Sequence, residues 1–265
     1  MDSIIGLSDR LYLALNALAG RSLLFDSFLA LAAENSLVKG GLIGACFAFA
    51  WYRADANPEA TIRRRQILLV TIAACFLVIA VTKTLSNLVF LPRPFVLSQN
   101  AYLMEGERLE ATPRLAFRVP LGEPDQAQFA KLRQGAIQEN DLGSFPSDHA
   151  GLFVALAVGI LLASRCAGLV ALGWALVVIL GSRMISGRHS PLDIAAGAAI
   201  GTAILLACQA IAARWGRPLM EPVARWTMAH PAMSSAVLFL FLFEAASTMG
   251  EFRDLARLAK SMVLG

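Results

Sequence analysis

The residues best suited to chemistry lie in one stretch, Gly-Ser-Arg-Met-Ile-Ser-Gly-Arg-His-Ser-Pro-Leu-Asp at 181–193. This stretch separates two apolar runs, and ionisable side chains at such places are costly and indicate function. Guanidinium groups bind anions, an imidazole attacks or transfers protons, and a carboxylate orients an imidazole. The stretch therefore predicts chemistry on a phosphate group, carried by Arg183, Arg188, His189 and Asp193.

His189 and Asp193 are four residues apart, so a helical turn would put the carboxylate one turn from the imidazole. A carboxylate bonded to one ring nitrogen would leave the other nitrogen free to act as a nucleophile. A structural alternative stays open, because Ser190, Pro191 and Asp193 also suit the start of the following helix. The two roles of Asp193 are compatible.

Two other clusters have the same polar character. Arg93 lies between two prolines just after an apolar run, so its guanidinium is presented by a stiff backbone; anchoring in lipid headgroups is the alternative. Lys83, inside that run, should snorkel to the surface or meet an anion. Ser147 is a good N-cap and predicts the start of a helix, whose free N–H groups would attract an anion. The alternative is that this segment only starts and caps the helix. His149 would then lie on the first turn, as a proton donor to a leaving oxygen.

The composition indicates that a membrane bundle positions these clusters. The chain is 57% hydrophobic and 16% charged, against roughly 25% charged residues in soluble domains. We therefore expect an all-α polytopic membrane protein. The net charge of +4 is spread over loops, so binding of nucleic acid is not expected. The cysteines lack metal-ligand spacing, and the polar clusters hold too few carboxylates for a two-metal site, so neither a metal nor another cofactor is expected.

We expect a single membrane domain over residues 1–265 with about six transmembrane helices. Residues 1–35 should form a helical segment at the membrane interface, and residues 92–146 a long extracytoplasmic insert between the second and third spans. The expected spans are 37–52, 66–91, 149–163, 167–185, 191–213 and 232–249.

Alternation of the spans places all three polar clusters on one membrane face. The opposite face receives short loops that are rich in arginine, and such loops stay in the cytoplasm. We therefore expect the clusters to face the periplasm or the outside of a cell (inner) membrane.

The motifs resemble the signatures of the type 2 phosphatidic acid phosphatase family over residues of about 66 to 210. Ser182-Arg183, His189 and Asp193 are spaced as in its third signature, Pro146-Ser147-Asp148-His149 resembles its second, Pro-Ser-Gly-His, and Arg93-Pro94 matches the end of its first.

The resemblance implies a metal-independent membrane phosphatase with a phosphohistidine intermediate. It makes His189 the nucleophile, Asp193 its partner and His149 the general acid. It assigns phosphate binding to Arg93, Arg183 and Ser147.

Two departures from the family pattern affect this assignment. The lysine of the first signature would fall at Ser86, whereas Lys83 lies about one helical turn earlier, and Asn87 is a further candidate. Asp148 replaces a glycine, and an acid is unfavourable beside a phosphate unless its side chain points away or caps the helix. The form Ser-Phe-Pro-Ser-Asp-His-Ala is similar to the bacitracin-resistance branch of undecaprenyl diphosphatases.

The expected reaction is hydrolysis of undecaprenyl diphosphate to undecaprenyl phosphate, a step of cell wall biogenesis. The expected partners are this lipid substrate and membrane lipids. Phosphatidylglycerophosphate, phosphatidate or a lipid A phosphate are alternative substrates, because the signatures contact only the phosphate. A non-catalytic lipid-binding or transport protein is a further alternative. The spacing of both histidines and Asp193 argues against it, because transport needs no nucleophile with an orienting partner. The roles of Arg188 and Glu244 stay open.

Overall fold

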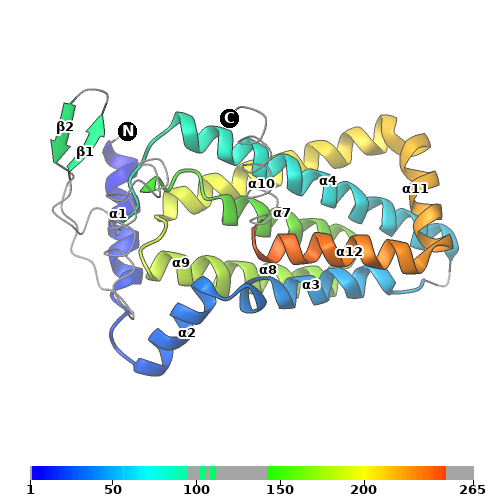
Figure 1. The fold of residues 1–265 in the computed structure, drawn as a ribbon, viewed down its shortest axis with the longest axis horizontal. Helices are drawn as coiled ribbons and strands as arrows, with labels where there is room; N and C mark the ends of the chain where they lie inside the picture. Colours follow the sequence, from blue (N-terminus) through cyan, green and yellow to red (C-terminus); the bar gives the residue numbers. More distant parts are fainter. Residues whose placement is uncertain (1, 56, 95–101, 106–107, 112–141, 249–265) are drawn as a thin grey trace, which may run out of the picture.

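The computed structural model describes residues 2–55, 57–94, 102–105, 108–111 and 142–248, which form helices apart from one two-stranded hairpin (Figure 1). In chain order the elements are α1 (Asp2–Asn16), α2 (Leu23–Glu34), α3 (Ser36–Tyr52), α4 (Pro58–Leu88), β1 (Tyr102–Glu105), β2 (Arg108–Ala111), α7 (Asp148–Ala163), α8 (Arg165–Trp174), the π-helical η2 (Ala175–Leu180), α9 (Gly181–Ile185), α10 (Pro191–Ile211), the π-helical η3 (Ala212–Gly216), α11 (Arg217–Ala229) and α12 (Pro231–Ala246).

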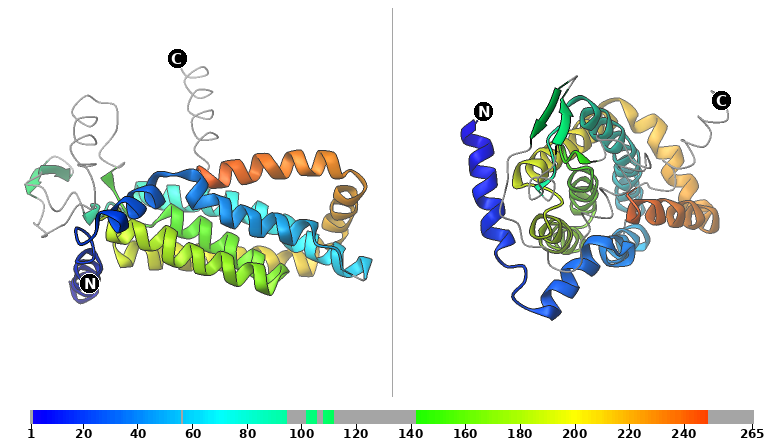
Figure 2. Two further views of the ribbon diagram at one scale, coloured as in Figure 1. Left: turned by 90° about the horizontal axis from the view of Figure 1, so that it is seen from below. Right: turned by 60° about the vertical axis from the view of Figure 1, so that its left-hand side comes forward.

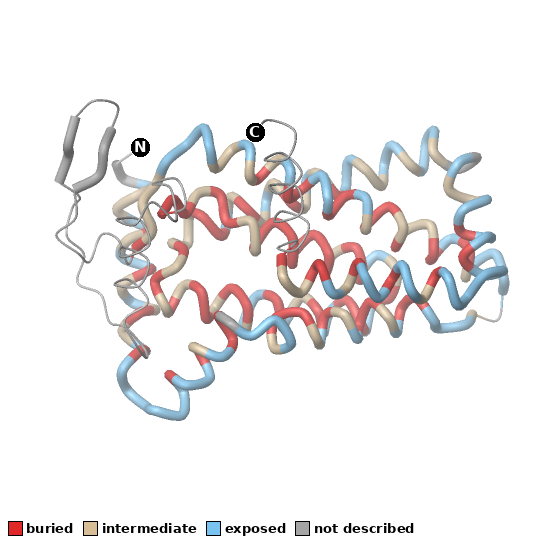
Figure 3. The backbone as a smooth tube through the Cα atoms, viewed as in Figure 1, coloured by how far each residue is buried: buried red, intermediate tan, exposed pale blue. Residues whose placement is uncertain are grey.

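Helix α7 is the centre of the bundle, with α3, α4, α8 and α10 packed around it (Figure 2). Its sequence is apolar on every side, as is typical of a helix without a solvent-facing side. Buried residues follow the inward sides of the surrounding helices (Figure 3). Large apolar side chains that point outward remain exposed, as a lipid-facing surface requires; examples are Leu169, Val177, Phe239 and Leu240.

Two glycines of α10 allow its backbone to touch that of α7. A Cβ atom at Gly197 would lie 2.2 Å from the carbonyl oxygen of Ser147, and one at Gly201 would lie 2.2 Å from that of Gly151. Small residues spaced four apart permit such close packing between membrane helices. The backbone N–H of Ser147 also donates to the carbonyl of Asp193 at 3.1 Å, so the starts of α7 and α10 are held together.

Each of the six expected apolar segments coincides largely with a helix. Three continuous helices are long and apolar enough to cross a membrane: Pro58–Leu88, Arg165–Ile185 and Pro191–Gly216. The pair α11 and α12, bent by 109°, would be a fourth if it were one span. Helices α3 and α7 are apolar but shorter. Among the described residues three or four spans are therefore supported, and the count of six stays a prediction.

The second segment starts earlier than expected. We placed its start at residue 66, but α4 begins at Pro58 and includes the arginine run that follows it. The side chain of Asn57 accepts from the N–H of Glu59, and proline suits the first helical position. The capped start at Asn57 and Pro58 therefore makes the arginine run part of the helix, although the run is polar.

The N-terminal segment consists of α1 and α2, with α1 lying across one end of the bundle (Figure 1). Two hydrogen bonds fasten α1 there: Asn16 Nδ2 donates to the carbonyl of Ile185 at 2.8 Å, and Ser8 Oγ accepts from the N–H of Leu192 at 3.2 Å. Its position at a membrane interface stays a prediction. Most of the expected insert at 92–146 lies outside the described residues.

Candidate functional site

The three polar clusters meet at the end of the bundle that α1 covers. Residues 91–94, which follow α4, run beside residues 142–144, which precede α7. The N–H of Arg93 donates to the carbonyl of Leu142 at 3.1 Å, and that of Ser144 donates to the carbonyl of Leu91 at 2.8 Å. The loop between α9 and α10 completes the cluster. Segments that are about 50 residues apart thus form one site.

His189 is buried in the loop between α9 and α10, and its Nδ1 lies 3.1 Å from the carbonyl oxygen of Ser144. A carbonyl oxygen can only accept a hydrogen bond, so Nδ1 carries the proton and Nε2 keeps its lone pair. Gly187, with φ of 74°, turns the chain immediately before this residue. The loop therefore presents a nucleophilic ring nitrogen.

Burial lowers the pKa of His189 well below its usual value, and the nearby charges of Arg93 and Arg183 lower it further. A positive imidazole is disfavoured by poor solvation and by two guanidinium groups. The ring is therefore neutral at physiological pH, which a nucleophile requires.

Asp193 caps the start of α10, and among the described residues no hydrogen bond joins it to His189. It forms a capping box with Ser190: the N–H of Ser190 donates to Asp193 Oδ2 at 2.6 Å, and Ser190 Oγ accepts from the N–H of Asp193 at 3.2 Å. Because Pro191 starts the helix, His189 precedes it, and the helical spacing of four residues does not apply. The contact of His189 Nδ1 is the Ser144 carbonyl, and the capping interpretation of Asp193 is the one observed.

His149 lies on the first turn of α7, with both ring nitrogens in contact with other groups. Its Nδ1 is 2.7 Å from Asp148 Oδ1, and its Nε2 is 2.6 Å from Nη2 of Arg183 and 3.0 Å from Oγ1 of Thr248. A guanidinium can only donate, so Nε2 accepts and Nδ1 donates to the carboxylate. The Asp148 carboxylate thus orients His149 and would stabilise its protonated form.

Lys83 explains how an acid is tolerated at position 148. Its Nζ lies 2.8 Å from Asp148 Oδ2, so the carboxylate is shared between a lysine and a histidine. The lysine one helical turn early and the aspartate in place of glycine are therefore partners. We expected Lys83 to hold phosphate; in the structure its ammonium neutralises Asp148 beside the site.

The two histidines face each other with ring centroids 6.5 Å apart. Arg183 reaches His149 from α9, and Arg93 Nε donates to the carbonyl of Gly143 at 3.1 Å. Ser147 is fully buried, and its Oγ caps α7 by accepting from the N–H of Ala150 at 3.3 Å. The expected phosphate ligands therefore surround the histidines, with Ser147 engaged as a cap.

Four residues of this end were not among the expected site residues. The carbonyl of Ser144 and the hydroxyl of Thr248 contact the histidines, and Asn16 fastens the end of α9. Lys39, buried in α3, is close enough to act electrostatically on His149. Lys39 carried a signal in the sequence, because a lysine inside an apolar run is costly. Ser144 opens the Ser-Phe-Pro-Ser-Asp-His-Ala motif, but the motif does not show that its carbonyl is the group in contact.

Comparison with known proteins decides the family. The model of the PAP2 superfamily matches residues 66–217, more than half of the chain. The chain belongs to the PAP2 superfamily. PAP2 proteins are phosphatases that act on phosphate esters, often those of lipids, so this chain is a phosphatase, and its apolar helices indicate a membrane-embedded one. No curated protein and no solved structure gave a significant match.

The expected family is thereby confirmed, and the match includes all the expected site residues: Lys83, Arg93, Ser147, His149, Arg183, His189 and Asp193. The match does not test the undecaprenyl diphosphatase branch. The catalytic and phosphate-binding roles of these residues stay predictions.

The site of this PAP2 protein also contains three potential metal ligands. Ligand atoms of Asp148, His149 and His189 all lie within 4.8 Å of one another, which fits one metal ion by distance. The Arg183 guanidinium, 2.6 Å from His149 Nε2, opposes a second cation at that nitrogen. Catalysis without a metal stays a prediction, and chelation tests it below.

The Lys83–Asp148 pair predicts coupled effects on turnover by this PAP2 protein. Asp148→Asn should lower kcat about 10- to 100-fold, because His149 loses the carboxylate that stabilises its protonated form. Lys83→Met should also lower kcat, because the carboxylate then binds His149 too tightly. The double variant should lose less than the product of the single losses. Thr84→Val, at an exposed position on the same helix, is the control. Independent, multiplying losses would contradict the pairing.

The lowered pKa of His189 predicts an acid-sensitive fold. Unfolded histidine has a pKa near 6.5, so the unfolded chain binds more protons than the native one as the pH falls below that value. Stability is therefore lost with falling pH. The thermal unfolding midpoint in detergent should fall more between about pH 7 and about pH 5 for the wild type than for His189→Asn. Parallel curves would show that His189 is not the group responsible.

Proposed function

We propose that this protein hydrolyses a lipid-linked phosphate or diphosphate by forming a phosphohistidine at His189. The observation that supports this most directly is the hydrogen bond from His189 Nδ1 to the Ser144 carbonyl. This bond fixes the tautomer whose Nε2 can attack phosphorus. The ring of the second histidine, His149, lies 6.5 Å from that of His189, measured between ring centroids. A nucleophile held in one tautomer, opposite an oriented acid, is what acyl and phosphoryl transfer require.

In the first step, His189 Nε2 bonds to phosphorus while the bond from phosphorus to the leaving oxygen breaks. For this step Arg183 exchanges its contact with His149 Nε2 for the substrate phosphate, which frees that nitrogen to carry a proton. Protonated His149 gives this proton to the leaving oxygen, and Arg93 and Arg183 neutralise the charge on the remaining oxygens. In the second step, water attacks phosphorus, the bond from phosphorus to His189 Nε2 breaks, and His149 takes the water's proton. Inorganic phosphate leaves, and both histidines return to their starting states. Asp148 stabilises His149 whenever it is protonated.

Undecaprenyl diphosphate is the substrate we propose, with undecaprenyl phosphate as the product. The support is the Ser-Phe-Pro-Ser-Asp-His-Ala motif and the Asp148–Lys83 pair, which makes its aspartate compatible with anion chemistry. With a diphosphate the leaving group is itself a phosphate monoester, which the general acid would protonate as it departs.

A phosphate-release assay tests both the activity and the substrate. Purified protein would be given prenyl diphosphates, phosphatidylglycerophosphate, phosphatidate and lipid A in matched micelles, with and without EDTA. We expect the highest kcat/KM with undecaprenyl diphosphate and no effect of EDTA. Faster turnover of another lipid would replace the substrate, and inhibition that Mg²⁺ or Zn²⁺ reverses would contradict the metal-independent mechanism.

We also propose that the site faces the periplasm or the outside of the cell membrane. Short arginine-rich segments at the opposite end of the bundle support this orientation. An impermeant thiol reagent should therefore label Phe90→Cys, next to the site, in intact cells. The native Cys166, exposed at the opposite end, should react only after permeabilisation. The reverse pattern would invert the proposed topology.

A further inference from the structure

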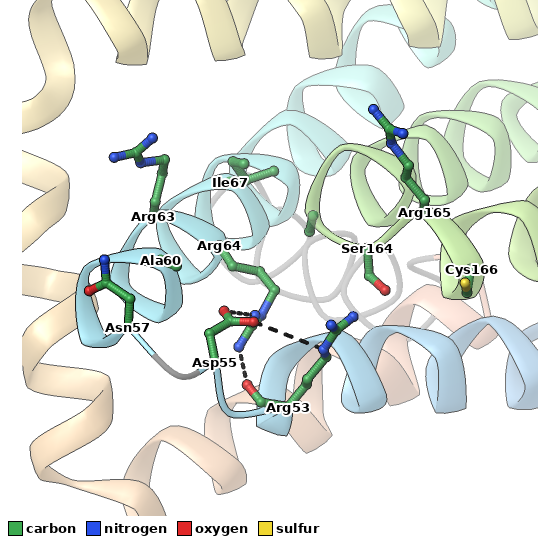
Figure 4. A pocket seen from close by; sticks show the side chains of 11 residues that line it. Arg53, Asp55, Asn57, Ala60, Arg63, Arg64, Ile67, Ser164, Arg165 and Cys166 are labelled. Atoms are coloured by element: carbon green, nitrogen blue, oxygen red, sulfur yellow. Dashed lines mark hydrogen bonds and ion pairs between the residues drawn. The ribbon is translucent and has the colours of Figure 1, made fainter.

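The opposite end of the bundle contains a basic pocket, with a volume of about 570 Å³ (Figure 4). It lies between the start of α4, the segment before it and the turn from α7 to α8. The pocket lies at the start of α4 and the catalytic site at the end of this 31-residue helix, so about 45 Å separates them. The residues that line it are Arg53, Asp55, Asn57, Ala60, Arg63, Arg64, Ile67, Ala163, Ser164, Arg165 and Cys166.

The pocket has an excess of positive charge. Four arginines and one carboxylate line it. Buried Arg64 already bonds to Asp55 and to the carbonyl of Arg53, so the carboxylate is neutralised within the wall. Arg63 on α4 and Arg165 on α8 also line the pocket, and their exposed side chains point outward from its rim (Figure 4). An anion is the complementary ligand.

Two helices also begin at this pocket, and their free N–H groups favour an anion. The start of α4 is capped by Asn57, but Ser164, the N-cap of α8, makes no side-chain cap. Its Oγ is buried and has no hydrogen-bond partner among the described residues. It lines the pocket between Arg53 and Arg165 (Figure 4). A buried hydroxyl without a partner costs free energy, which a ligand oxygen would recover.

An apolar groove adjoins the basic pocket at Cys166. It has a volume of about 300 Å³ and lies between α3 and α8, on the lipid-facing side of the bundle. The residues that line it are Ala45, Cys46, Phe49, Cys166, Ala167 and Val170. A ligand that joins an anionic head to an acyl chain would fill both cavities at once, and a free anion would fill only the first.

We propose that this pocket binds the phosphate of an anionic phospholipid from the leaflet opposite the catalytic site. Arg63 and Arg165 turn inward from the rim to pair with the phosphate, and Ser164 donates to one of its oxygens. An acyl chain lies in the groove beside Phe49 and Val170. Basic pockets between membrane helices bind such headgroups on the cytoplasmic side. The bound lipid would join α4 to α8. This site is distinct from the catalytic one and does not depend on the proposed activity.

Native mass spectrometry and thermal unfolding of the full chain test the proposal. Phosphatidylglycerol should remain bound to the wild type and raise its unfolding midpoint, and phosphatidylcholine should do neither. The variant Arg63→Gln/Arg165→Gln should lose most of both effects. Arg214→Gln is the matched control, because Arg214 is an exposed arginine outside the pocket.

A second pair of measurements distinguishes a lipid from a soluble anion. Val170→Trp should obstruct the groove and weaken the effect of phosphatidylglycerol, while leaving any weak effect of inorganic phosphate unchanged. Equal effects of phosphatidylglycerol on the wild type and the double arginine variant would overturn the site. Equal stabilisation by inorganic phosphate and by the lipid, both unaffected by Val170→Trp, would overturn the assignment to a lipid.

Discussion

Replacing His189 with asparagine should lower lipid phosphate hydrolysis by at least ~10³-fold, because it removes the atom that attacks phosphorus. Asparagine can still donate an amide N–H to the Ser144 carbonyl, so the loop should keep its conformation. The measurement is steady-state phosphate release, together with acid-quenched trapping of labelled phosphate on the protein. Wild-type protein should retain an acid-labile label, and His189→Asn should retain none.

Two results would contradict this role of His189. One is turnover within about tenfold of the wild type, since the loss of a nucleophile costs far more. The other is an undiminished label in His189→Asn, which would move the covalent bond to another residue. Ser186→Ala, three positions earlier in the same loop, is the control for disturbance of the loop.

Replacing His149 with glutamine should have the second-largest effect, a loss of about 10²- to 10⁴-fold with the lipid substrate. The loss should depend on the leaving group. An alkoxide, the leaving group of a lipid phosphate monoester such as phosphatidate, needs the proton that His149 supplies, whereas p-nitrophenolate leaves without one. Phosphatidate is therefore the lipid substrate for this comparison. We therefore expect a much smaller loss with p-nitrophenyl phosphate. Kinetics of both substrates with both proteins provide the measurement.

An equal loss with both substrates would remove His149 from acid catalysis and leave it a role in binding. Phe153→Leu is a matched control, because Phe153 is buried one turn further along α7, with its ring 6.2 Å from that of His149. It should alter packing around the histidine without removing the proton donor.

The apolar runs and the motif spacings were sufficient to predict most helices and the grouping of the clusters. The helices and the grouping of the clusters follow from residue types and their spacing. The start of α10 could be predicted in the same way, because Ser190, Pro191 and Asp193 each suit their capping positions. The partner of His189 could not be predicted in this way. It is the carbonyl of Ser144, and any residue carries a carbonyl. Its position depends on how the segment before α7 runs beside the end of α4.

The Lys83–Asp148 pair shows a second limit. Each residue departed from the family pattern, and each departure was considered separately. Their contact of 2.8 Å depends on how α4 is rotated against α7, which a pattern within one helix does not specify. The basic pocket has the same origin, because its arginines come from helices whose ends meet only in the folded bundle.

The glycine contact between α7 and α10 has a consequence for how this protein can vary. A methyl group at Gly197 would collide with the Ser147 carbonyl, at the very turn that carries His149. Even alanine there would displace the acid from the nucleophile, whereas outward-facing positions such as Val177 can exchange one apolar side chain for another. Substitutions that adapt the protein to a different lipid should therefore accumulate on the outer surface, while this seam between two helices stays unchanged.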